Sequence, residues 1–249
     1  MCASSRARAA SAPGDTTKSL PCRPTIACTA DIVSPGLFEL ETGMLFRHLD
    51  GRGRQWSLPF LAKLSLTRWA QLQVGSNGYT TEWNDVPARY FDNVAVGVKL
   101  HALDQGATVP SLAFSAALSI PTVGDQLGYT SAYDALFIAY VTKDFGPVHA
   151  DLNLGLNGFA LGGSTVTQEW VALALSASLP PPFGVMVESY YFSEASPAAA
   201  KDGGTLVALS LTPRPWLVFD FGGDVGYFPN KRDYSSFVGM TIVPLVLWL

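Results

Sequence analysis

The sequence is poor in charge for its length. Only 14% of its 249 residues are Asp, Glu, Lys or Arg, whereas 48% are hydrophobic. Soluble domains carry about 25% charged residues, so much of the usual solvating charge is missing. The formal net charge is −4. This argues against a nucleic-acid-binding protein, because such proteins normally carry a basic surface.

The sequence also lacks a long hydrophobic run. No stretch of about 18 consecutive apolar residues occurs, which is the length that predicts a transmembrane helix. A chain this apolar without such a helix is explained either by a large buried β core or by a membrane β-barrel. Only helices and closed barrels satisfy all backbone polar groups in lipid.

Cysteine is scarce, and all three cysteines (Cys2, Cys22 and Cys28) lie in the first 35 residues. Cys22 and Cys28 could form a disulfide in an oxidising compartment or remain free thiols. Three cysteines without neighbouring histidines make a poor zinc site. Residues 1–35 are small and polar and contain proline, which predicts a flexible segment. They hold no apolar stretch typical of a secretory signal, so an exported protein would require a removed signal, a truncated sequence or a wrongly assigned start.

Apolar and polar side chains alternate along much of the remaining chain, less cleanly near residues 133–143, 167–179, 184–193 and 204–212. Between residues 148 and 157, Val, Ala and Leu alternate with His, Asp, Asn and Gly. Successive side chains of a strand point to opposite faces, so this window predicts a strand with one apolar and one polar face. The same pattern predicts twelve strands, near residues 37–49, 55–66, 69–82, 90–102, 110–121, 133–143, 147–158, 167–179, 184–193, 204–212, 216–228 and 234–247.

The lengths of these strands and their connections favour a membrane barrel. Soluble strands average about 5–6 residues, whereas a tilted strand needs about 9–11 to cross a bilayer, and most of the predicted strands are at least that long. Mostly short turns alternate with mostly longer polar loops, such as 78–89, 122–132, 158–166 and 194–203. We therefore predict an all-β fold: a single antiparallel transmembrane β-barrel of about 12 strands over residues 36–249. Short periplasmic turns, longer extracellular loops and periplasmic termini complete this prediction.

Aromatic residues mark the ends of the predicted strands. Four of them sit at or beside the tight turns: Trp69, Phe145, Phe183 and Trp216. Aromatic girdles at the two membrane interfaces are typical of such barrels, and the alternative is that these rings are ordinary core aromatics at strand ends. Together with strand length and loop alternation, the pattern favours the girdle and predicts outer-membrane lipid as a partner.

Charged and polar side chains fall on the face opposite the apolar one, which a barrel turns toward its lumen. The predicted lumen-lining residues, and the candidate solute path, are Glu39, Glu41, Lys63, Lys99, His101, His149, Asp151, Asn153, Glu188, Asp220 and Asp224. This mixed-sign set either lines a polar conduit or forms an internal ion-pair network. Our hypothesis is that Lys63 and Lys99 contribute to conduction. Lower thermal stability with unchanged conductance in an alanine double variant would favour the structural interpretation.

Signatures of catalysis are missing. The three histidines form no metal-spaced pair, no G-x-S-x-G motif occurs, and no phosphate-binding or dinucleotide glycine motif is present. We therefore predict no catalytic residue, no metal site and no cofactor. An outer-membrane enzyme with its site elsewhere on the barrel is the less favoured alternative.

Several stretches resemble one family of bacterial outer-membrane barrels, the meta-pathway phenol-degradation family that is often labelled "transporter". They are residues 57–80, 94–124, 141–158 and 224–240, which share Gly, turn and alternation patterns with it. The resemblance implies an outer-membrane location and passage of aromatic or other small hydrophobic compounds. Two features depart from such barrels. The terminal Leu247-Trp248-Leu249 places its aromatic residue one position early, and Pro244 in an unbroken apolar tail is expected to disturb the last strand.

The predicted function is passive passage or binding of a small-molecule solute by a monomer or small homo-oligomer. Residues 1–35 could enter from the periplasm and plug the lumen, in which case deleting residues 1–34 would raise conductance. Twelve strands enclose only a modest interior. The alternatives are a closed barrel with a structural or interaction role, and a soluble β-sandwich or ligand-binding barrel with its apolar face inward.

Overall fold

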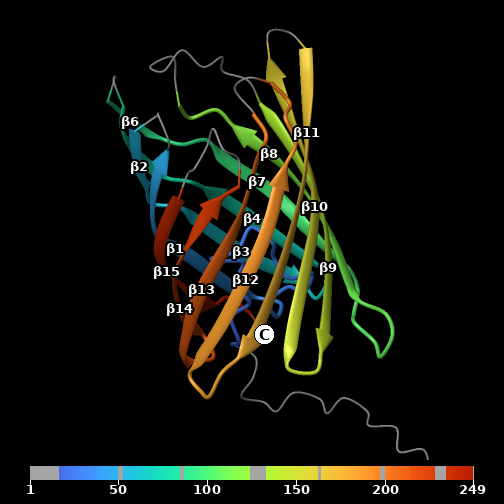
Figure 1. Ribbon diagram of the computed structural model, residues 1–249. Coiled ribbons are helices and arrows are strands. Elements are labelled where there is room, and N and C mark those ends of the chain that lie inside the picture. Colours follow the sequence, from blue (N-terminus) through green and yellow to red (C-terminus); the bar gives the residue numbers. More distant parts are fainter. Residues whose placement is uncertain are drawn as a thin grey trace, which may run out of the picture.

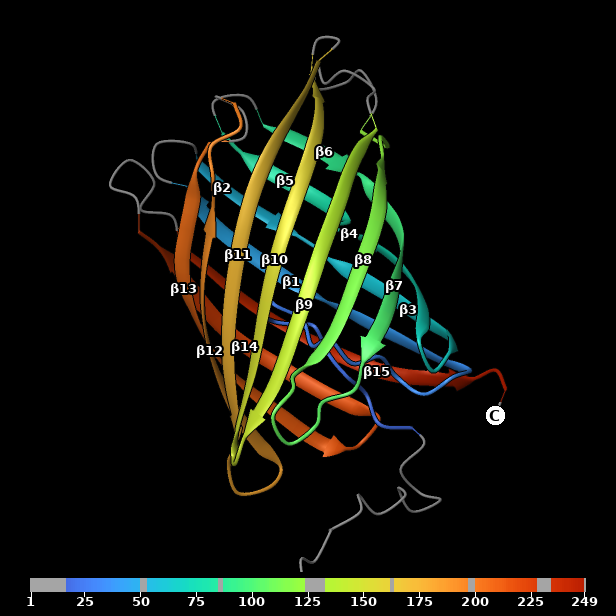
Figure 2. The same ribbon diagram turned by 90° about the vertical axis from the view of Figure 1, so that its right-hand side faces the viewer.

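The computed structural model describes residues 17–49, 53–84, 87–123, 133–161, 164–196, 200–227 and 234–248 (Figures 1 and 2). These residues form one antiparallel sheet that closes on itself, because the last strand pairs with the first. None of them forms a helix long and apolar enough to cross a bilayer. The described strands are β1 (Leu37–Leu49), β2 (Gly53–Ser57), β3 (Phe60–Thr67), β4 (Ala70–Ser76), β5 (Tyr79–Trp83), β6 (Ala88–Phe91), β7 (Val94–Leu103), β8 (Ser111–Ile120), β9 (Asp134–Phe145), β10 (Val148–Leu161), β11 (Ser164–Ser178), β12 (Phe183–Phe192), β13 (Asp202–Arg214), β14 (Leu217–Gly226) and β15 (Tyr234–Val246).

The barrel wall has twelve strands, as predicted, but three of them are interrupted. Strands expected to run unbroken over 55–66, 69–82 and 90–102 are each divided, into β2 and β3, β4 and β5, and β6 and β7. The first break holds Pro59, which has no N–H for a ladder hydrogen bond. The second holds Gly78, whose φ of 67° suits glycine. The third lies beside the second, since the N–H of Asp92 donates to the carbonyl of Gly78 at 2.9 Å.

The apolar face of the wall points outward. In β10, Leu154 and Leu156 are 49% and 45% exposed, whereas Asn153, which directly precedes Leu154, is fully buried. β14 repeats this arrangement, with Phe219 and Phe221 outside and Asp220 inside. Outward apolar and inward polar side chains are the arrangement of a barrel surrounded by lipid, and they exclude the alternative in which the apolar face is buried between two sheets.

One local prediction was wrong. Residues 158–166 were expected to form a long loop, but β10 continues to Leu161 and β11 begins at Ser164, so most of this stretch is paired strand. Pro244 disturbs the last strand, as predicted, but the strand continues past it to Val246. The register of β1 and β15 shifts between Phe38 and Leu40, and Pro244 lies within that shift. A bulge of this kind tolerates proline because one residue there leaves the hydrogen-bonded ladder.

The tight turns and the start of β1 share one end of the barrel with the end of β15 (Figure 1). Four aromatic side chains surround this short-turn end: Trp69, Phe145, Phe183 and Trp216 are 56%, 63%, 54% and 38% exposed. Their position is that of the girdle predicted from sequence, and their contact with a membrane interface remains a prediction.

Candidate functional site: the occupied lumen

Residues 17–36, which we call the luminal segment, lie inside the barrel between its opposite walls (Figure 2). Residues 1–16 of the predicted flexible segment lie outside the described residues. Inward-facing side chains from around the wall hold the segment: Glu39 and Glu41 (β1), Lys63 (β3), Lys99 and His101 (β7), Ser111 (β8), Thr142 (β9), Asn153 (β10), Glu188 (β12) and Asp220 (β14).

Two buried glutamates each accept a pair of consecutive backbone N–H groups. Glu41 accepts from Cys22 at 2.9 Å and from Arg23 at 2.8 Å, one carboxylate oxygen for each. Glu188 accepts from Ile26 and Ala27 at 2.8 and 2.6 Å in the same way. Hydrogen bonds to a charged acceptor are stronger than neutral ones. These two carboxylates therefore recognise the backbone of the segment rather than its side chains.

Asn153 extends this backbone recognition. Its amide oxygen accepts from the N–H of Cys28 and its amide nitrogen donates to the carbonyl of the same residue, both at 2.8 Å. Thr142 accepts from the N–H of Ala30 at 2.7 Å. The segment has no regular secondary structure, so several of its backbone groups depend on these side chains for their hydrogen bonds.

Small apolar residues make room for the segment. Ala27 packs against Ala172 and Ala174 of β11 together with Trp170, and Ala30 packs near Ala113 of β8. Inward alanines leave space that larger side chains would fill. Nearer the short-turn end, an apolar cluster of Val33, Leu37 and Val243 fixes the segment to the pairing of β1 with β15.

Lys63 connects the segment to a buried ion-pair cluster. Its Nζ contacts Glu39 and lies 2.5 Å from Glu41, and all three side chains are at most 3% exposed. The same nitrogen donates to the carbonyl of Leu20 at 2.7 Å, and Glu39 accepts from the N–H of Leu20 at 2.7 Å. The cluster is therefore shared between the wall and the segment.

Lys99 has a different environment although it is just as deeply buried. Its ammonium donates to the carbonyls of Thr29 and Asp31, the latter at 3.2 Å, and lies 4.3 Å from the centre of the Tyr140 ring. Among the described residues, no carboxylate lies within ion-pair distance of it. Carbonyl dipoles and a cation–π contact solvate the charge but do not neutralise it.

Arg23 occupies a gap that glycines create. Gly43 of β1 and Gly239 of β15 pair with each other, and Asp220 of β14 pairs with Gly239. A Cβ placed on Gly239 would lie 2.5 Å from Nε and Nη2 of Arg23, so the guanidinium occupies the space that a side chain would take. Asp220 contacts this guanidinium at 3.4 Å.

The other predicted lumen residues have different partners. His101 contacts the carbonyl of Ala30 at 3.1 Å as well as Asp104. His149 lies between Asp144 and Asp151 at the short-turn end, at 2.7 and 3.2 Å. Asp224 does not contact the segment, and it accepts hydrogen bonds from Tyr190 and Ser235 further along the lumen.

Sequence reasoning missed several residues of this site. The side chains of Thr142 and Ser111 point into the lumen. They would have been found if hydroxyl side chains on the polar face of each strand had been counted with the charged ones. The gap of Gly43 and Gly239 left no sequence signal, because it depends on two strands at opposite ends of the chain meeting in one register.

The luminal segment separates two cavities of the lumen. One, of about 320 Å³, lies toward the long-loop end and is lined by residues that include Phe60, Leu136 and Tyr140. The other, of about 720 Å³, opens toward the short-turn end, near His149. Arg23 and Thr25 line both cavities, so the segment forms the partition between them.

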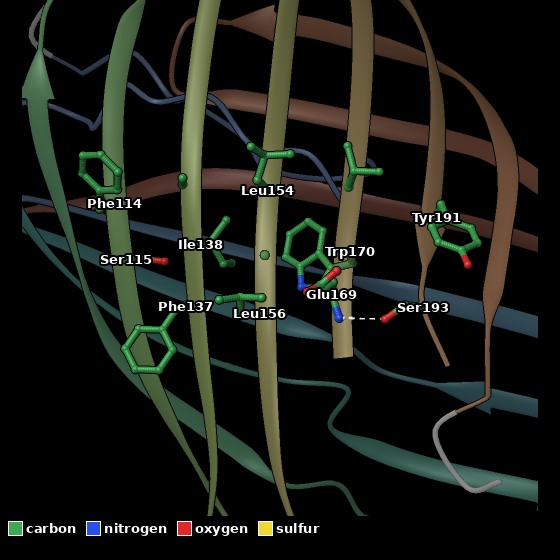
Figure 3. A pocket seen from close by; sticks show the side chains of 13 residues that line it. Phe114, Ser115, Phe137, Ile138, Leu154, Leu156, Glu169, Trp170, Tyr191 and Ser193 are labelled. Carbon is green, nitrogen blue, oxygen red and sulfur yellow. Dashed lines mark hydrogen bonds between the residues drawn. The ribbon is translucent and has the colours of Figure 1, made fainter. Parts of the chain in front are cut away.

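A further hollow of about 590 Å³ lies on β8 to β12 (Figure 3). Exposed apolar side chains, including Phe114, Phe137 and Leu154, line it. At one side of it, the N–H of Glu169 donates to Oγ of Ser193 at 2.9 Å. Phe114, Phe137 and Leu154 face outward, so this hollow opens on the apolar outer surface, although the buried Trp170 also lines it.

The described part of the chain holds no group of three or more His, Cys, Asp or Glu side chains that could bind a metal ion.

No family model and no curated protein matches the sequence. Solved structures do resemble the fold. An outer membrane channel from Pseudomonas putida F1 matches with a TM-score of 0.60 and 10% identity, covering 86% of this chain and 97% of that one. The NanC porin matches with a TM-score of 0.57 and 10% identity, covering 82% and 98%. These likenesses show the fold, which is that of an outer-membrane β-barrel.

Proposed function

We propose that this protein is a bacterial outer-membrane channel for small molecules, and that the luminal segment closes it until the segment moves. The observation that carries the proposal is the partition of the lumen by residues 17–36 between two cavities. The exposed apolar belt supports a membrane location, and the likeness to solved outer-membrane barrels supports the fold that such channels use.

The proposed class of solute is supported by the resemblance to the phenol-degradation family and by the cavity on the long-loop side. Phe60, Leu136 and Ile138 give this cavity apolar walls, while Gln73 and Ser115 add polar groups. A mixed lining of this kind suits small aromatic or other hydrophobic compounds that carry one polar group. Passage needs only a lined path with weak sites, so no cofactor or energy source enters the proposal.

Conductance in planar lipid bilayers tests the proposal. The full chain and a variant lacking residues 1–34 are refolded in detergent, and heat-modifiable mobility on a denaturing gel selects preparations with a folded barrel. We expect small or rare conductance steps from the full chain and at least several-fold larger ones from the deletion. Liposome swelling with benzyl alcohol, compared with a sugar of similar size, then reports the preference for aromatic solutes.

The partition also favours a second candidate, a permanently closed barrel with a structural or interaction role. A folded deletion variant that conducts no better than the full chain would support that candidate and reject the channel.

A further inference from the structure

The luminal segment contains a disulfide whose two sulfurs each lie beside a buried lysine. Cys22 and Cys28 are bonded to each other. Nζ of Lys63 lies 3.8 Å from Sγ of Cys22, and Nζ of Lys99 lies 3.9 Å from Sγ of Cys28. Both lysines are at most 2% exposed. An ammonium group at this distance favours the thiolate form of a cysteine once the disulfide is opened.

The two lysines are not equivalent partners. Lys63 is already neutralised by Glu39 and Glu41. Lys99 contacts carbonyl groups, an aromatic ring and a sulfur, with no carboxylate at ion-pair distance in the described part of the chain. A thiolate on Cys28 would be the counter-ion that this buried cation lacks. The environment therefore stabilises the reduced form of Cys28 specifically.

Access to the disulfide is from the cavity on the long-loop side, which both cysteines line. Cys22 is half-buried, whereas Cys28 is 8% exposed and packs against Ala30 and Tyr140. An incoming thiolate therefore reaches Sγ of Cys22 more easily, and Cys28 then becomes the leaving group.

We propose that Cys22–Cys28 is a thiol–disulfide exchange site that a small dithiol reduces. One thiolate of the dithiol attacks Sγ of Cys22. The Cys22–Cys28 bond breaks, and Cys28 leaves as a thiolate beside Lys99. The second thiol of the dithiol loses its proton to solvent and attacks the mixed disulfide, and Cys22 leaves and takes up a proton. The dithiol is oxidised to its disulfide, and the protein gains two electrons. Stabilisation of the leaving thiolate makes such a disulfide easier to reduce.

The consequence for the lumen rests on the proposed function. The loop between the two cysteines presents the N–H groups of Arg23, Ile26 and Ala27 to Glu41 and Glu188. A disulfide stabilises a loop mainly by limiting its alternative conformations. Reduction would lift that limit while leaving the hydrogen bonds in place, so we expect weaker closure rather than complete release.

The test is a redox titration of the full chain in a Cys2→Ser background, so that only the two relevant thiols are counted. The folded protein is equilibrated with mixtures of reduced and oxidised dithiothreitol, quenched with acid and labelled with a maleimide for mass spectrometry. We expect Lys99→Met to require about tenfold more reducing mixtures than wild type, and Lys99→Arg to stay within about twofold. Lys143→Met is the matched control, because Lys143 also donates to backbone carbonyls but lies near no sulfur in the described structure.

Coincident titrations of wild type and Lys99→Met would overturn the proposal, and so would an equal shift in the Lys143→Met control. If Lys99→Met does not fold, the reduced wild-type protein still tests whether Cys28 is stabilised as a thiolate. We expect it to show the ultraviolet absorbance of one thiolate at neutral pH, and its absence would reject the site. Conductance of the reduced protein tests the proposed channel separately from the exchange site. A protein that does not conduct would reject the channel but leave the redox titration unchanged.

Discussion

Gly43 of β1 lies directly opposite Gly239 of β15, where the first strand closes the barrel on the last. The missing side chains leave room for the guanidinium of Arg23, which reaches this pairing from the luminal segment. The segment is therefore anchored at the seam where the barrel closes.

Gly239→Ala is expected to displace Arg23 without disturbing the wall. The nearest atoms to a Cβ at this position belong to the end of the Arg23 side chain, which can move. We expect larger or more frequent conductance steps and an unchanged midpoint of heat-modifiable mobility. Gly158→Ala is the control, since its Cβ would meet its nearest neighbour at an ordinary 3.7 Å. Equal conductance of the two variants would contradict this role of the gap.

Glu188→Gln is expected to loosen the segment around Ile26 and Ala27. The substitution keeps one acceptor but turns an NH₂ group toward an N–H, so one charge-assisted hydrogen bond of about 1.5–3 kcal/mol is lost. Amide hydrogen exchange followed by mass spectrometry should show about tenfold faster exchange for peptides covering residues 20–30. Glu169→Gln, at an exposed position, should leave the exchange unchanged.

Lys63→Ala should destabilise the folded barrel. It leaves Glu39 and Glu41 buried without their cation, and breaking a buried ion pair in this way costs about 3–5 kcal/mol. The midpoint of heat-modifiable mobility should fall, whereas Lys18→Ala at an exposed position should not change it. An unchanged midpoint together with altered ion selectivity would instead support the hypothesis that Lys63 belongs to a conduction path.

Leu154→Arg tests the lipid-facing surface. Leu154 is 49% exposed on the outer face of β10, and an arginine at the middle of the bilayer costs about 2–4 kcal/mol. The free energy of unfolding, measured by urea titration in lipid bilayers, should fall by that amount. Val109→Arg, in the connection between β7 and β8, should cost less than about 1 kcal/mol. Equal costs at both positions would contradict the membrane orientation.

Much of the wall could be predicted from the sequence because alternation is a local property. The chain from residue 148 to residue 157 places its side chains on two opposite faces whatever else the protein does, and the lack of charge on one face predicts lipid as its surroundings. The breaks at Pro59 and Gly78 were not predicted, because a strand of this length can run straight or bend at such a residue. The continuation of β10 and β11 through the expected loop at 158–166 could not be predicted either, because it depends on the pairing of the two strands with each other.

By itself, the sequence determined the number of strands in the wall, which face of the clearly alternating strands points outward, and most of the charged residues in the lumen. Only the tertiary structure decided what those polar residues bind. Glu41 and Glu188 lie on strands far apart in the sequence, yet both accept hydrogen bonds from one short backbone stretch that has no periodicity of its own. Whether an inward carboxylate contacts water or a backbone N–H depends on how far the segment reaches into the closed barrel. The position of the segment in the lumen is defined only once the first and last strands have paired.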